Sequence, residues 1–360
     1  MIIAVNTRSF SKKNNPESFI ELALLQISKN NPAHQFIFFV DESFITETAL
    51  SKNIVIVKSR SSAKSSFLSA LWHNYQLPAL LKKHKPALLI NTKSVTPAST
   101  KIPQWMVIEN QSIFDQSKRK LTNVISQAAV IIANSTYLKT LLSGCTTDTE
   151  KIKVVYNAPE KIYAPLTWEE KQIVLKQYSN EKEYFFCNAS NCNEDKLISL
   201  LKAFSIFKKW QKSNMQLIIA SDNLSKSFKE NYKHYKHKED VILLEEFSAK
   251  DLAAITGSAY GYINPDENTG YSKILAAIQC NIPVVTISNE ISEEVFVDAV
   301  IYCKPDNIDE MAKNMILLYK DENRRNELIK KGVAISHKHS YAGSLQALNN
   351  LIFKESPTLL

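Results

Sequence analysis

One stretch of the chain decides the fold, and it reads LLEEFSAKDLAAITGSAYGYINPDENTGYSKILAAIQCNIPVV from Leu243 to Val285. It contains a short apolar run at Gly261–Asn264 and enters a second one, Val284–Ile287, and both have the length of buried strands. Between these runs, Ser272–Gln279 has the residues of a helix. Strands that alternate with helices form parallel sheets with right-handed crossovers. The stretch therefore predicts an α/β fold.

The same alternation extends along the chain in both directions from this stretch. In the first half, strands are predicted at Ile2–Asn6, Gln35–Val40, Ile54–Lys58, Leu88–Asn91, Gln104–Glu109 and Ala128–Ala133. In the second half, further strands are predicted at Val154–Tyr156, Tyr184–Asn188, Gln216–Ala220, Val241–Leu244 and Ile301–Tyr302. Helices are predicted at Pro16–Asn30, Ser65–Lys83, Asn134–Ser143, Asp195–Lys209, Ala249–Thr256, Ser292–Val297 and Ile308–Lys320.

The length of 360 residues suits two domains better than one. We therefore expect two Rossmann-like domains that face each other across a cleft. The first covers residues 1–160 and the second covers residues 161–338. The connection lies near Ala158–Trp168, where two prolines interrupt the pattern. Residues 339–360 are expected to form a helix, over about Tyr341–Phe353, that returns toward the first domain.

Composition and charge narrow the class of protein. The chain is 44% hydrophobic and 22% charged, with a formal net charge of +8. This charge favours acidic partners such as phosphates, nucleotides or an anionic membrane surface, or it is a solvated lysine-rich surface. Five scattered cysteines without a CxxC pair suit a reducing cytosol and disfavour a zinc site. The start of the chain reads as a buried strand and not as a signal peptide, and no apolar stretch reaches about 18 residues. We expect a cytoplasmic protein, with peripheral membrane association allowed by the charge.

Several kinds of chemistry have no support in the sequence. There is no G-x-S-x-G nucleophile elbow and no G-x-G-x-x-G dinucleotide fingerprint. The segment Lys226–Lys238 mixes lysines and histidines with aromatic residues, a mixture that occurs in nucleic-acid and membrane contacts. Without an accompanying RNA-binding signature, we interpret it as a surface helix that rests on its aromatic side, and we predict no nucleic-acid partner.

Polar residues at the carboxyl ends of the strands are the candidates for ligand binding. The segment Asn264–Ala277 leaves a strand and opens a helix, whose N-terminal N–H groups and dipole suit a phosphate. Gly270 would let the backbone approach a ligand, Ser272 can cap the helix, and Lys273 can neutralise phosphate. Glu267 or Asp266 can accept hydrogen bonds from sugar hydroxyls. An ordinary capped loop is the alternative interpretation.

A second loop carries polar residues after the predicted strand Tyr184–Asn188. Ser190, Asn191 and Asn193 can contact a diphosphate through side chains and backbone N–H groups. A polar turn without a ligand explains the same residues equally well.

Four segments in order resemble glycosyltransferase family 4, the retaining enzymes of the GT-B fold. Ala133–Pro159 (ANSTYLKTLLSGCTTDTEKIKVVYNAP) resembles the end of that family's first domain, and Leu197–Phe207 (LISLLKAFSIF) resembles the first helix of its second domain. The opening stretch, Leu243–Val285, resembles the donor-site region. Asp306–Gly332 (DNIDEMAKNMILLYKDENRRNELIKKG) and the HSY at His339–Tyr341 resemble the closing helices. The resemblance covers most of the second half and is weaker over the first.

The resemblance implies a GT-B fold and a glycosyltransferase, a hexosyltransferase of polysaccharide biosynthesis. It would move a sugar from a nucleotide diphosphate sugar, held by the second domain, to a polysaccharide or lipid-linked acceptor held by the first. It implies no metal and no cofactor, because helix N-termini and a basic side chain stabilise the leaving diphosphate. The catalytic positions fall on Glu109, Asn110 and Glu267. The donor-binding positions fall on Ser190, Lys196, Asn268, Gly270, Tyr271, Ser272 and Lys273.

The chain departs from the family pattern at several of these positions. Ala276 stands where the family has its second glutamate, and the first falls on Glu267 or Asn268. Glu194-Asp-Lys196 replaces an Arg-Lys-Asn, and Glu109-Asn110 replaces a His-Asp. The turn after the first strand, from Arg8 to Asn15, has no glycine.

These departures motivate a second hypothesis, a catalytically degenerate GT-B protein that acts as a sugar-binding or regulatory subunit. A third hypothesis is a different two-domain α/β binding protein, similar to a nucleotide-sugar epimerase or to a periplasmic binding protein. One continuous sheet across both halves would exclude the GT-B fold.

Overall fold

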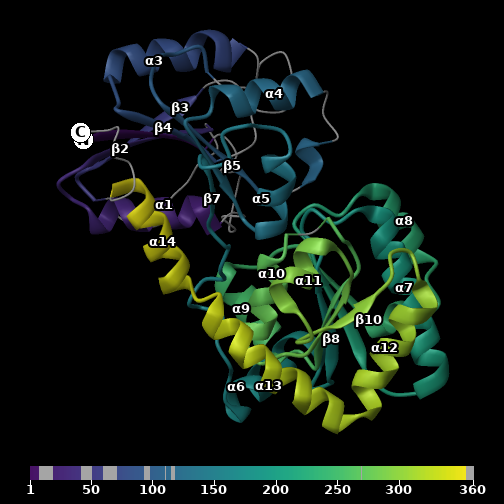
Figure 1. Ribbon diagram of the computed structural model, residues 1–360. Helices are drawn as coiled ribbons and strands as arrows, with labels where there is room; N and C mark the ends of the chain where they lie inside the picture. The colour runs from purple at the N-terminus through teal and green to yellow at the C-terminus, as the bar shows by residue number, and fades with distance from the viewer. Residues whose placement is uncertain are drawn as a thin grey trace. The chain divides into compact units, whose positions relative to one another are not determined.

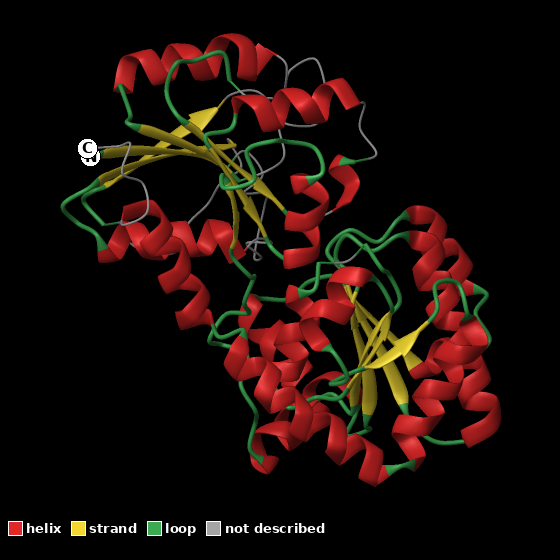
Figure 2. Ribbon diagram, viewed as in Figure 1, coloured by secondary structure: helices red, strands yellow, loops and turns green. Residues whose placement is uncertain are grey.

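The chain divides into two compact units, residues 1–157 with 342–360, and residues 158–341. The computed structural model describes residues 1–7, 19–41, 51–59, 71–92, 98–109, 111–114, 118–268 and 270–353. Each unit has its own parallel sheet with helices on both faces (Figures 1 and 2). Among the described residues no strand joins the two sheets, as the predicted two-domain fold requires.

The first unit is built on a seven-stranded sheet in the order β3-β2-β1-β4-β5-β6-β7. Its strands are β1 (Ile2–Asn6), β2 (Gln35–Asp41), β3 (Ile54–Ser59), β4 (Leu88–Asn91), β5 (Gln104–Ile108), β6 (Val130–Ala133) and β7 (Ile152–Val154). All neighbouring pairs are parallel. The apolar N-terminal residues form the buried central strand that the sequence predicts, since Ile3, Ala4 and Val5 are all fully buried.

Helices cover both faces of this sheet. They are α1 (Phe19–Asn30), α3 (Leu77–His84), α4 (Lys118–Gln127), α5 (Thr136–Ser143) and α14 (Tyr341–Phe353), with a π-helical turn η1 (Trp72–Gln76) and a 3-10 turn η2 (Gln111–Ile113). Figure 1 shows α3 on one side of the sheet and α1 on the other. The end of α14 packs beside α1, where Asn31 Nδ2 donates to Asn349 Oδ1 at 3.0 Å. The ring of Phe353 stacks on His34 with 4.7 Å between the centroids.

The second unit is built on a six-stranded sheet in the order β10-β9-β8-β11-β12-β13. Its strands are β8 (Tyr184–Asn188), β9 (Gln216–Ala220), β10 (Val241–Leu244), β11 (Gly261–Asn264), β12 (Val284–Ile287) and β13 (Ile301–Cys303). The pairs are again parallel. The direction in which successive strands are added reverses between β8 and β11, which is where open α/β sheets bind their ligands.

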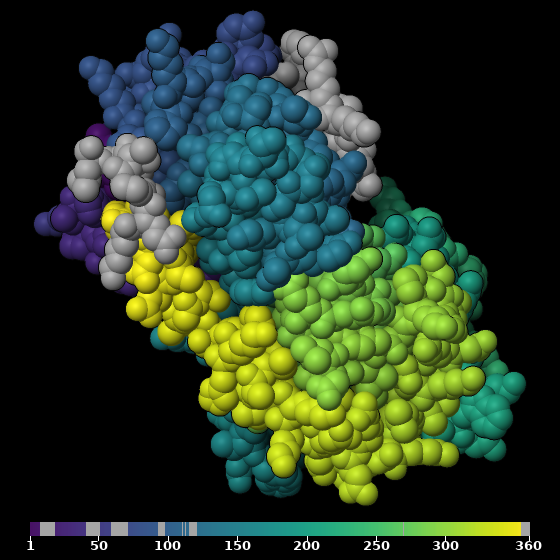
Figure 3. Space-filling model, in the orientation of Figure 1, coloured from purple at the N-terminus to yellow at the C-terminus, as the bar shows by residue number. Residues whose placement is uncertain are grey.

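The helices of the second unit lie in two layers around this sheet. They are α6 (Trp168–Ser179), α7 (Glu194–Gln211), α8 (Lys226–Lys233), α9 (Ala249–Ser258), α10 (Ser272–Gln279), α11 (Glu290–Phe296), α12 (Ile308–Lys320) and α13 (Glu322–Lys338), with a 3-10 turn η3 (Lys238–Asp240). One core cluster joins the buried faces of α7, α8 and α12 to β8, β9 and β11–β13. In Figure 3, the side chains of α10–α13 cover most of the face of this unit that is turned to the viewer.

Several predicted elements differ from the observed ones by one or two residues at their ends, and two of them illustrate the cause. The strand predicted at Val154–Tyr156 lies two residues earlier, because β7 pairs with β6 from Ile152 opposite Ile131 to Val154 opposite Ala133. The helix predicted at Ser292–Val297 begins at Glu290, since Asn289 caps it. Of the helix predicted at Ser65–Lys83, only the part from residue 71 lies in the described residues.

The basic and aromatic segment Lys226–Lys238 is a surface element that rests on its aromatic side, as predicted. Phe228 on α8 is buried in the core. The hydroxyl of Tyr232 donates to the carbonyl of Val241 at 2.7 Å, and that of Tyr235 donates to Leu201 at 2.8 Å. Its aromatic residues are therefore used for packing. Within the described part of the chain, no helix combines the length and hydropathy that a membrane crossing requires.

Candidate functional site

The candidate site lies at the carboxyl edge of the sheet of the second unit. The loops that follow β8 and β11 leave this edge next to each other, because β8 and β11 are paired strands. The helices α7, α10, α11 and α12 begin at the same edge, so their N-terminal N–H groups are oriented toward it. The topology thus brings together residues that lie far apart in the sequence.

Asp266 holds the two central loops together. Its side chain is buried, and its oxygens accept hydrogen bonds from the backbone N–H of Asn193 and of Asn268, both at 2.9 Å. The side chain of Asn264 donates to the carbonyl of Asp266 at 3.0 Å and to Thr286 Oγ1 at 3.0 Å. Asp266 is therefore a positioning residue that braces the loops. The sequence prediction considered it only as a sugar ligand.

Lys196 and Glu267 form an ion pair across this edge. The Lys196 Nζ lies 3.0 Å from Glu267 Oε1 and 2.8 Å from Asp306 Oδ1, in the turn between β13 and α12. Burial alone would lower the pKa of Lys196, but the hydrogen bonds to Asp306 and Glu267 outweigh it and raise the pKa. Glu267 has a second oxygen, Oε2, that is buried and has no hydrogen-bond partner among the described residues. Its carbonyl accepts from Asn289 Nδ2 at 2.7 Å.

Lys273 and Ser190, two of the predicted donor-binding residues, are in contact. Lys273 extends from the first turn of α10, and its ammonium donates to the carbonyl of Ser190. A longer contact of 3.4 Å reaches the carbonyl of Asn188. The Ser190 N–H in turn donates to Asn188 Oδ1 at 3.2 Å, which fixes the turn after β8. A lysine ammonium thus bridges the β8 and β11 loops.

The N-terminus of α10 contains the remaining predicted donor-binding residues. A Cβ added to Gly270 would meet no atom within 4 Å, so the space beside this backbone is open. Tyr271 is buried, and its ring packs edge-on against Phe296 with 6.3 Å between centroids. The prediction that Ser272 caps the helix is wrong, because Tyr271 occupies the N-cap position and makes no side-chain cap bond. The side chain of Tyr271 therefore does not cap the N-terminal N–H groups of α10.

The two catalytic positions predicted in the first unit follow β5. Asn110 lies outside the described residues. The carboxylate of Glu109 accepts from Asn157 Nδ2 at 3.1 Å, and its carbonyl accepts from Asn134 Nδ2 at 2.7 Å. These anchoring roles were not predicted from the sequence. The neighbouring Ser135 caps α5, where its side chain accepts from the N–H of Leu138. The sequence feature that could have indicated these roles is that Asn134 follows β6 and Asn157 follows β7, at the carboxyl ends of the strands.

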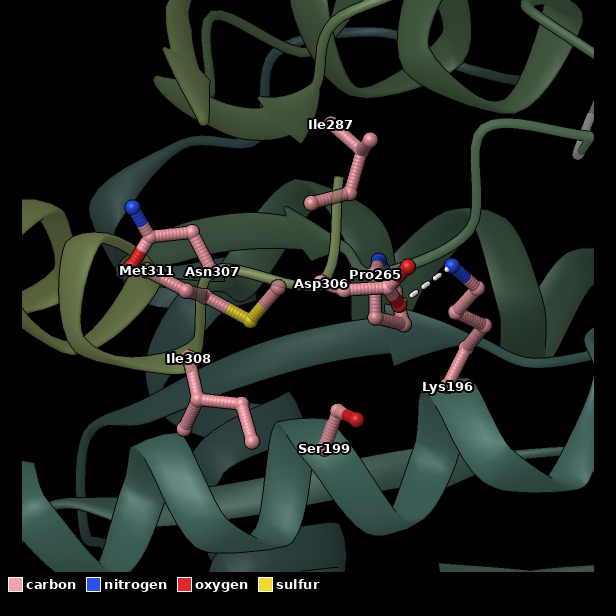
Figure 4. Close-up of a pocket in the computed structure, with 8 residues that line it drawn as sticks. All are labelled: Lys196, Ser199, Pro265, Ile287, Asp306, Asn307, Ile308 and Met311. Atoms are coloured by element: carbon pink, nitrogen blue, oxygen red, sulfur yellow. Dashed lines mark hydrogen bonds and ion pairs between the residues drawn. The ribbon is translucent and has the colours of Figure 1, made fainter. Parts of the chain in front are cut away.

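A shallow hollow with a cavity volume of about 10 Å³ lies beside the Lys196 ion pairs and opens to solvent (Figure 4). It is far smaller than typical ligand pockets of about 300–1,000 Å³, since a cavity of this size has room for about one water molecule. Its lining residues are Lys196, Ser199, Pro265, Ile287, Asp306, Asn307, Ile308 and Met311. Figure 4 shows Lys196 extending from α7 toward Asp306 at one side of the pocket. Among the described residues, no group of histidine, cysteine or acidic side chains is arranged to hold a metal ion.

Comparisons of whole structures identify the fold as GT-B. HepE from Anabaena, solved in complex with UDP and glucose, has a TM-score of 0.75 at 15% identity, covering 98% of this chain and 99% of its own. WaaG, a glycosyltransferase involved in lipopolysaccharide biosynthesis, has a TM-score of 0.76 at 11% identity, covering 98% and 100%. Sucrose-phosphate synthase from Thermosynechococcus elongatus has a TM-score of 0.80 at 9% identity, covering 99% and 100%. The GT-B prediction is therefore confirmed for the fold.

The sequence itself matches a family model over the second unit. Residues 170–334 match the model of the glycosyl transferases group 1. This range contains the loops after β8 and β11, Lys196, Glu267 and Lys273, and it supports the prediction that the chain is a transferase enzyme. A search of the curated proteins with the full sequence gave no match.

Proposed function

We propose that this protein is a glycosyltransferase that moves a hexosyl group from a nucleotide diphosphate sugar to a polysaccharide or lipid-linked acceptor. The observation that carries the proposal is the arrangement at the carboxyl edge of the second sheet. There, Lys196, Lys273 and the N-terminus of α10 gather around the switch point of the sheet, inside the range that the family model matches. Basic groups and the N-terminus of a helix are suited to a diphosphate.

In this proposal the donor diphosphate lies at the N-terminus of α10, beside Gly270. The open space at Gly270 would let the phosphates approach the backbone N–H groups, with Asn268, Tyr271 and Ser272 flanking them. As the bond to the sugar breaks, negative charge develops on the diphosphate. Fixed positive charge placed in advance stabilises such a leaving group. Lys273 and Lys196 supply that charge, so we propose that no metal and no cofactor is required.

Glu267 and Glu109 are the proposed catalytic carboxylates. The unpartnered Oε2 of Glu267 suits a hydroxyl of the donor sugar, whose hydrogen bond would fix the orientation of the sugar. Glu109 would face the reacting sugar together with Asn110, and its carboxylate can accept the proton of the acceptor hydroxyl. From the resemblance to family 4 we further propose that the anomeric configuration is retained, which NMR of the released product would test.

The similar structures suggest which substrates to test first. HepE was solved with UDP and glucose, so UDP-glucose is the first donor to try. WaaG is described as a glycosyltransferase of lipopolysaccharide biosynthesis, so a lipid-linked glycan is the first acceptor class. We place the reaction in the cytoplasm, at a membrane surface when the acceptor is lipid-linked. The thiols of all five cysteines are free, as a reducing compartment requires.

Calorimetry with UDP-, GDP- and ADP-sugars tests this proposal. We expect saturable binding of one nucleotide class and slow hydrolysis of its sugar in the absence of acceptor. Addition of EDTA should leave both binding and hydrolysis unchanged. If no nucleotide sugar binds, the proposal is overturned. If one binds but the sugar is neither hydrolysed nor transferred, the protein is a donor-binding subunit and not an enzyme.

A further inference from the structure

Lys196 is shared between two carboxylates that come from different loops. Glu267 lies in the loop after β11, and Asp306 lies in the turn after β13. The side chain of Lys196 is only 14% exposed, so its ammonium makes these contacts partly out of water. Opposite charges attract more strongly when they are partly desolvated. The ammonium is therefore held firmly by two anions before any ligand arrives.

The three charges together leave this part of the site negative. One ammonium faces two carboxylates, so the local sum is one negative charge. A diphosphate that approaches Lys196 meets this negative charge as well as the ammonium. It gains the full attraction of Lys196 only if one of the carboxylates gives up its contact.

Asp306 is the carboxylate that is able to leave. Its side chain is 76% exposed, so its carboxylate regains water as soon as the contact breaks. Glu267 is only 27% exposed, and its loop is tied to Asn289 through the carbonyl. The release of Glu267 would disturb the loop that leads to α10. The release of Asp306 requires only the rotation of one exposed side chain.

We propose that Asp306 competes with the donor diphosphate for Lys196 and thereby sets the affinity of the site for nucleotide diphosphates. This inference rests on the proposed function, because it assumes that Lys196 contacts the diphosphate. Asp306 then acts as an internal anion that occupies the position of a phosphate oxygen in the empty site. Binding of the donor exchanges one anionic partner of Lys196 for another, which makes binding weaker than it would be to a free lysine.

The variant Asp306→Asn removes the negative charge and keeps the local backbone. Asp306 has a positive φ of 58°, a conformation that asparagine adopts as readily as aspartate. The matched control is Asp309→Asn, which removes an exposed carboxylate from the first turn of α12. Both variants change the net charge equally. Only the first one removes a carboxylate that is paired with Lys196.

Calorimetric titrations with UDP, GDP and ADP at fixed ionic strength test the inference. For the nucleotide that binds the wild type, D306N should lower Kd about three- to fivefold, and D309N should change it by less than about twofold. The decrease in Kd caused by D306N should disappear when Lys196 is also replaced by methionine, because Asp306 then has no ammonium to compete for. An unchanged Kd in D306N, or an equal gain in D309N or in the Lys196→Met background, overturns the inference alone. Failure of the wild type to bind any of the three nucleotides overturns the proposed function with it.

Discussion

At the residue scale, the site is organised by which polar atoms are already paired and which are not. Asp266 uses both carboxylate oxygens on backbone N–H groups, so it serves the loops. Glu267 uses one oxygen on Lys196 and leaves the other without a partner. Buried polar atoms in folded proteins are usually hydrogen-bonded, and this oxygen can be satisfied by a hydroxyl of a ligand. It makes Glu267 the better candidate for contact with the donor.

Lys273 belongs to the same scale, and its replacement tests the donor site directly. Lys273→Met keeps most of the side-chain volume and removes the ammonium that bridges to Ser190. We expect the Kd for the donor nucleotide to rise about tenfold, since hydrogen bonds to charged groups are worth about 1.5–3 kcal/mol. Turnover should fall further, by about a hundredfold, because the same charge stabilises the leaving diphosphate. Calorimetry and a transfer assay give the two values.

The control for this variant is Lys313→Met on the exposed face of α12. It removes the same charge from the same unit and should change neither binding nor turnover. Equal effects of the two substitutions would mean that only the net charge matters, and that Lys273 has no specific role.

His339 predicts a dependence of stability on pH. Burial, with a smaller contribution from Lys338, lowers the pKa of His339 to about 4, while Glu294 on α11 opposes the shift. The unfolded chain has a histidine pKa of about 6.5, so it binds a proton at a higher pH than the folded chain does. The contribution of His339 to the free energy of unfolding is therefore fully present above about pH 6.5. It is lost as the pH falls toward about 4, which lowers the free energy of unfolding by up to about 3 kcal/mol.

Denaturant unfolding at several pH values measures this effect. In His339→Gln the decrease between about pH 6.5 and pH 4 should be much smaller than in the wild type. His337→Gln, which changes an exposed histidine on the same helix, should keep the wild-type decrease. If the His339 variant shows the same slope as the wild type, the buried histidine is not its source.

At the element scale, a residue that caps a helix N-terminus also contacts the candidate donor site. Asn289 caps α11 by accepting from the N–H of Ser292 at 2.7 Å, and its amide also donates to the carbonyl of Glu267. One side chain thus ends a strand-to-helix loop and fixes the loop of the neighbouring strand. Thr167 caps α6 with a similar reciprocal arrangement, in which its side chain accepts from the N–H of Glu170 on the same helix.

Replacement of Asn289 by alanine should therefore have two effects. The loss of the cap should lower the free energy of unfolding by about 1–2 kcal/mol. The loss of the amide should also loosen Glu267 and weaken donor binding by about two- to fivefold. Thr167→Ala should lower stability by about the same amount and leave donor binding unchanged. A comparison of thermal melts and calorimetric Kd values for the two variants separates the cap from the contact to Glu267; equal Kd values would refute the second effect.

At the element scale, the sequence predicts the bounds of several strands and helices but not the contacts between loops. The strand Gly261–Asn264 and the helix Ser272–Gln279 were predicted with their observed bounds, because apolar runs and helix starts are local properties. The brace by Asp266 and the ion pair of Lys196 with Asp306 could not be predicted. They join loops that are distant in the sequence, and only the order of strands in the sheet makes them neighbours. The error at Ser272 is local, since Ser272 is the first residue of the helix and Tyr271 occupies the cap position.

At the scale of the whole molecule, the end of the chain completes the first unit and the middle of the chain forms the second. Residues 342–353 of α14 belong to the first unit, where Leu348, Leu351 and Ile352 are buried. A helix about three hundred residues from α1 in sequence therefore contributes to the same core. The residues that we propose for donor binding, in contrast, all belong to the second unit. Stability and donor binding should thus be separable along the chain.

This separation gives a prediction for thermal unfolding. Leu348→Ala removes a fully buried side chain from α14 and should destabilise the first unit by about 2–5 kcal/mol. A saturating donor nucleotide, at about a hundred times its Kd, should stabilise the second unit by about 2.7 kcal/mol. Calorimetric scans should then show two transitions, one lowered by the variant and the other raised by the nucleotide. The control Leu317→Ala, at a half-exposed position on α12, should shift either transition only slightly. A single transition that responds to both changes would mean that the units unfold together, because contacts between them are strong enough to couple a defect in one sheet to the ligand bound at the other.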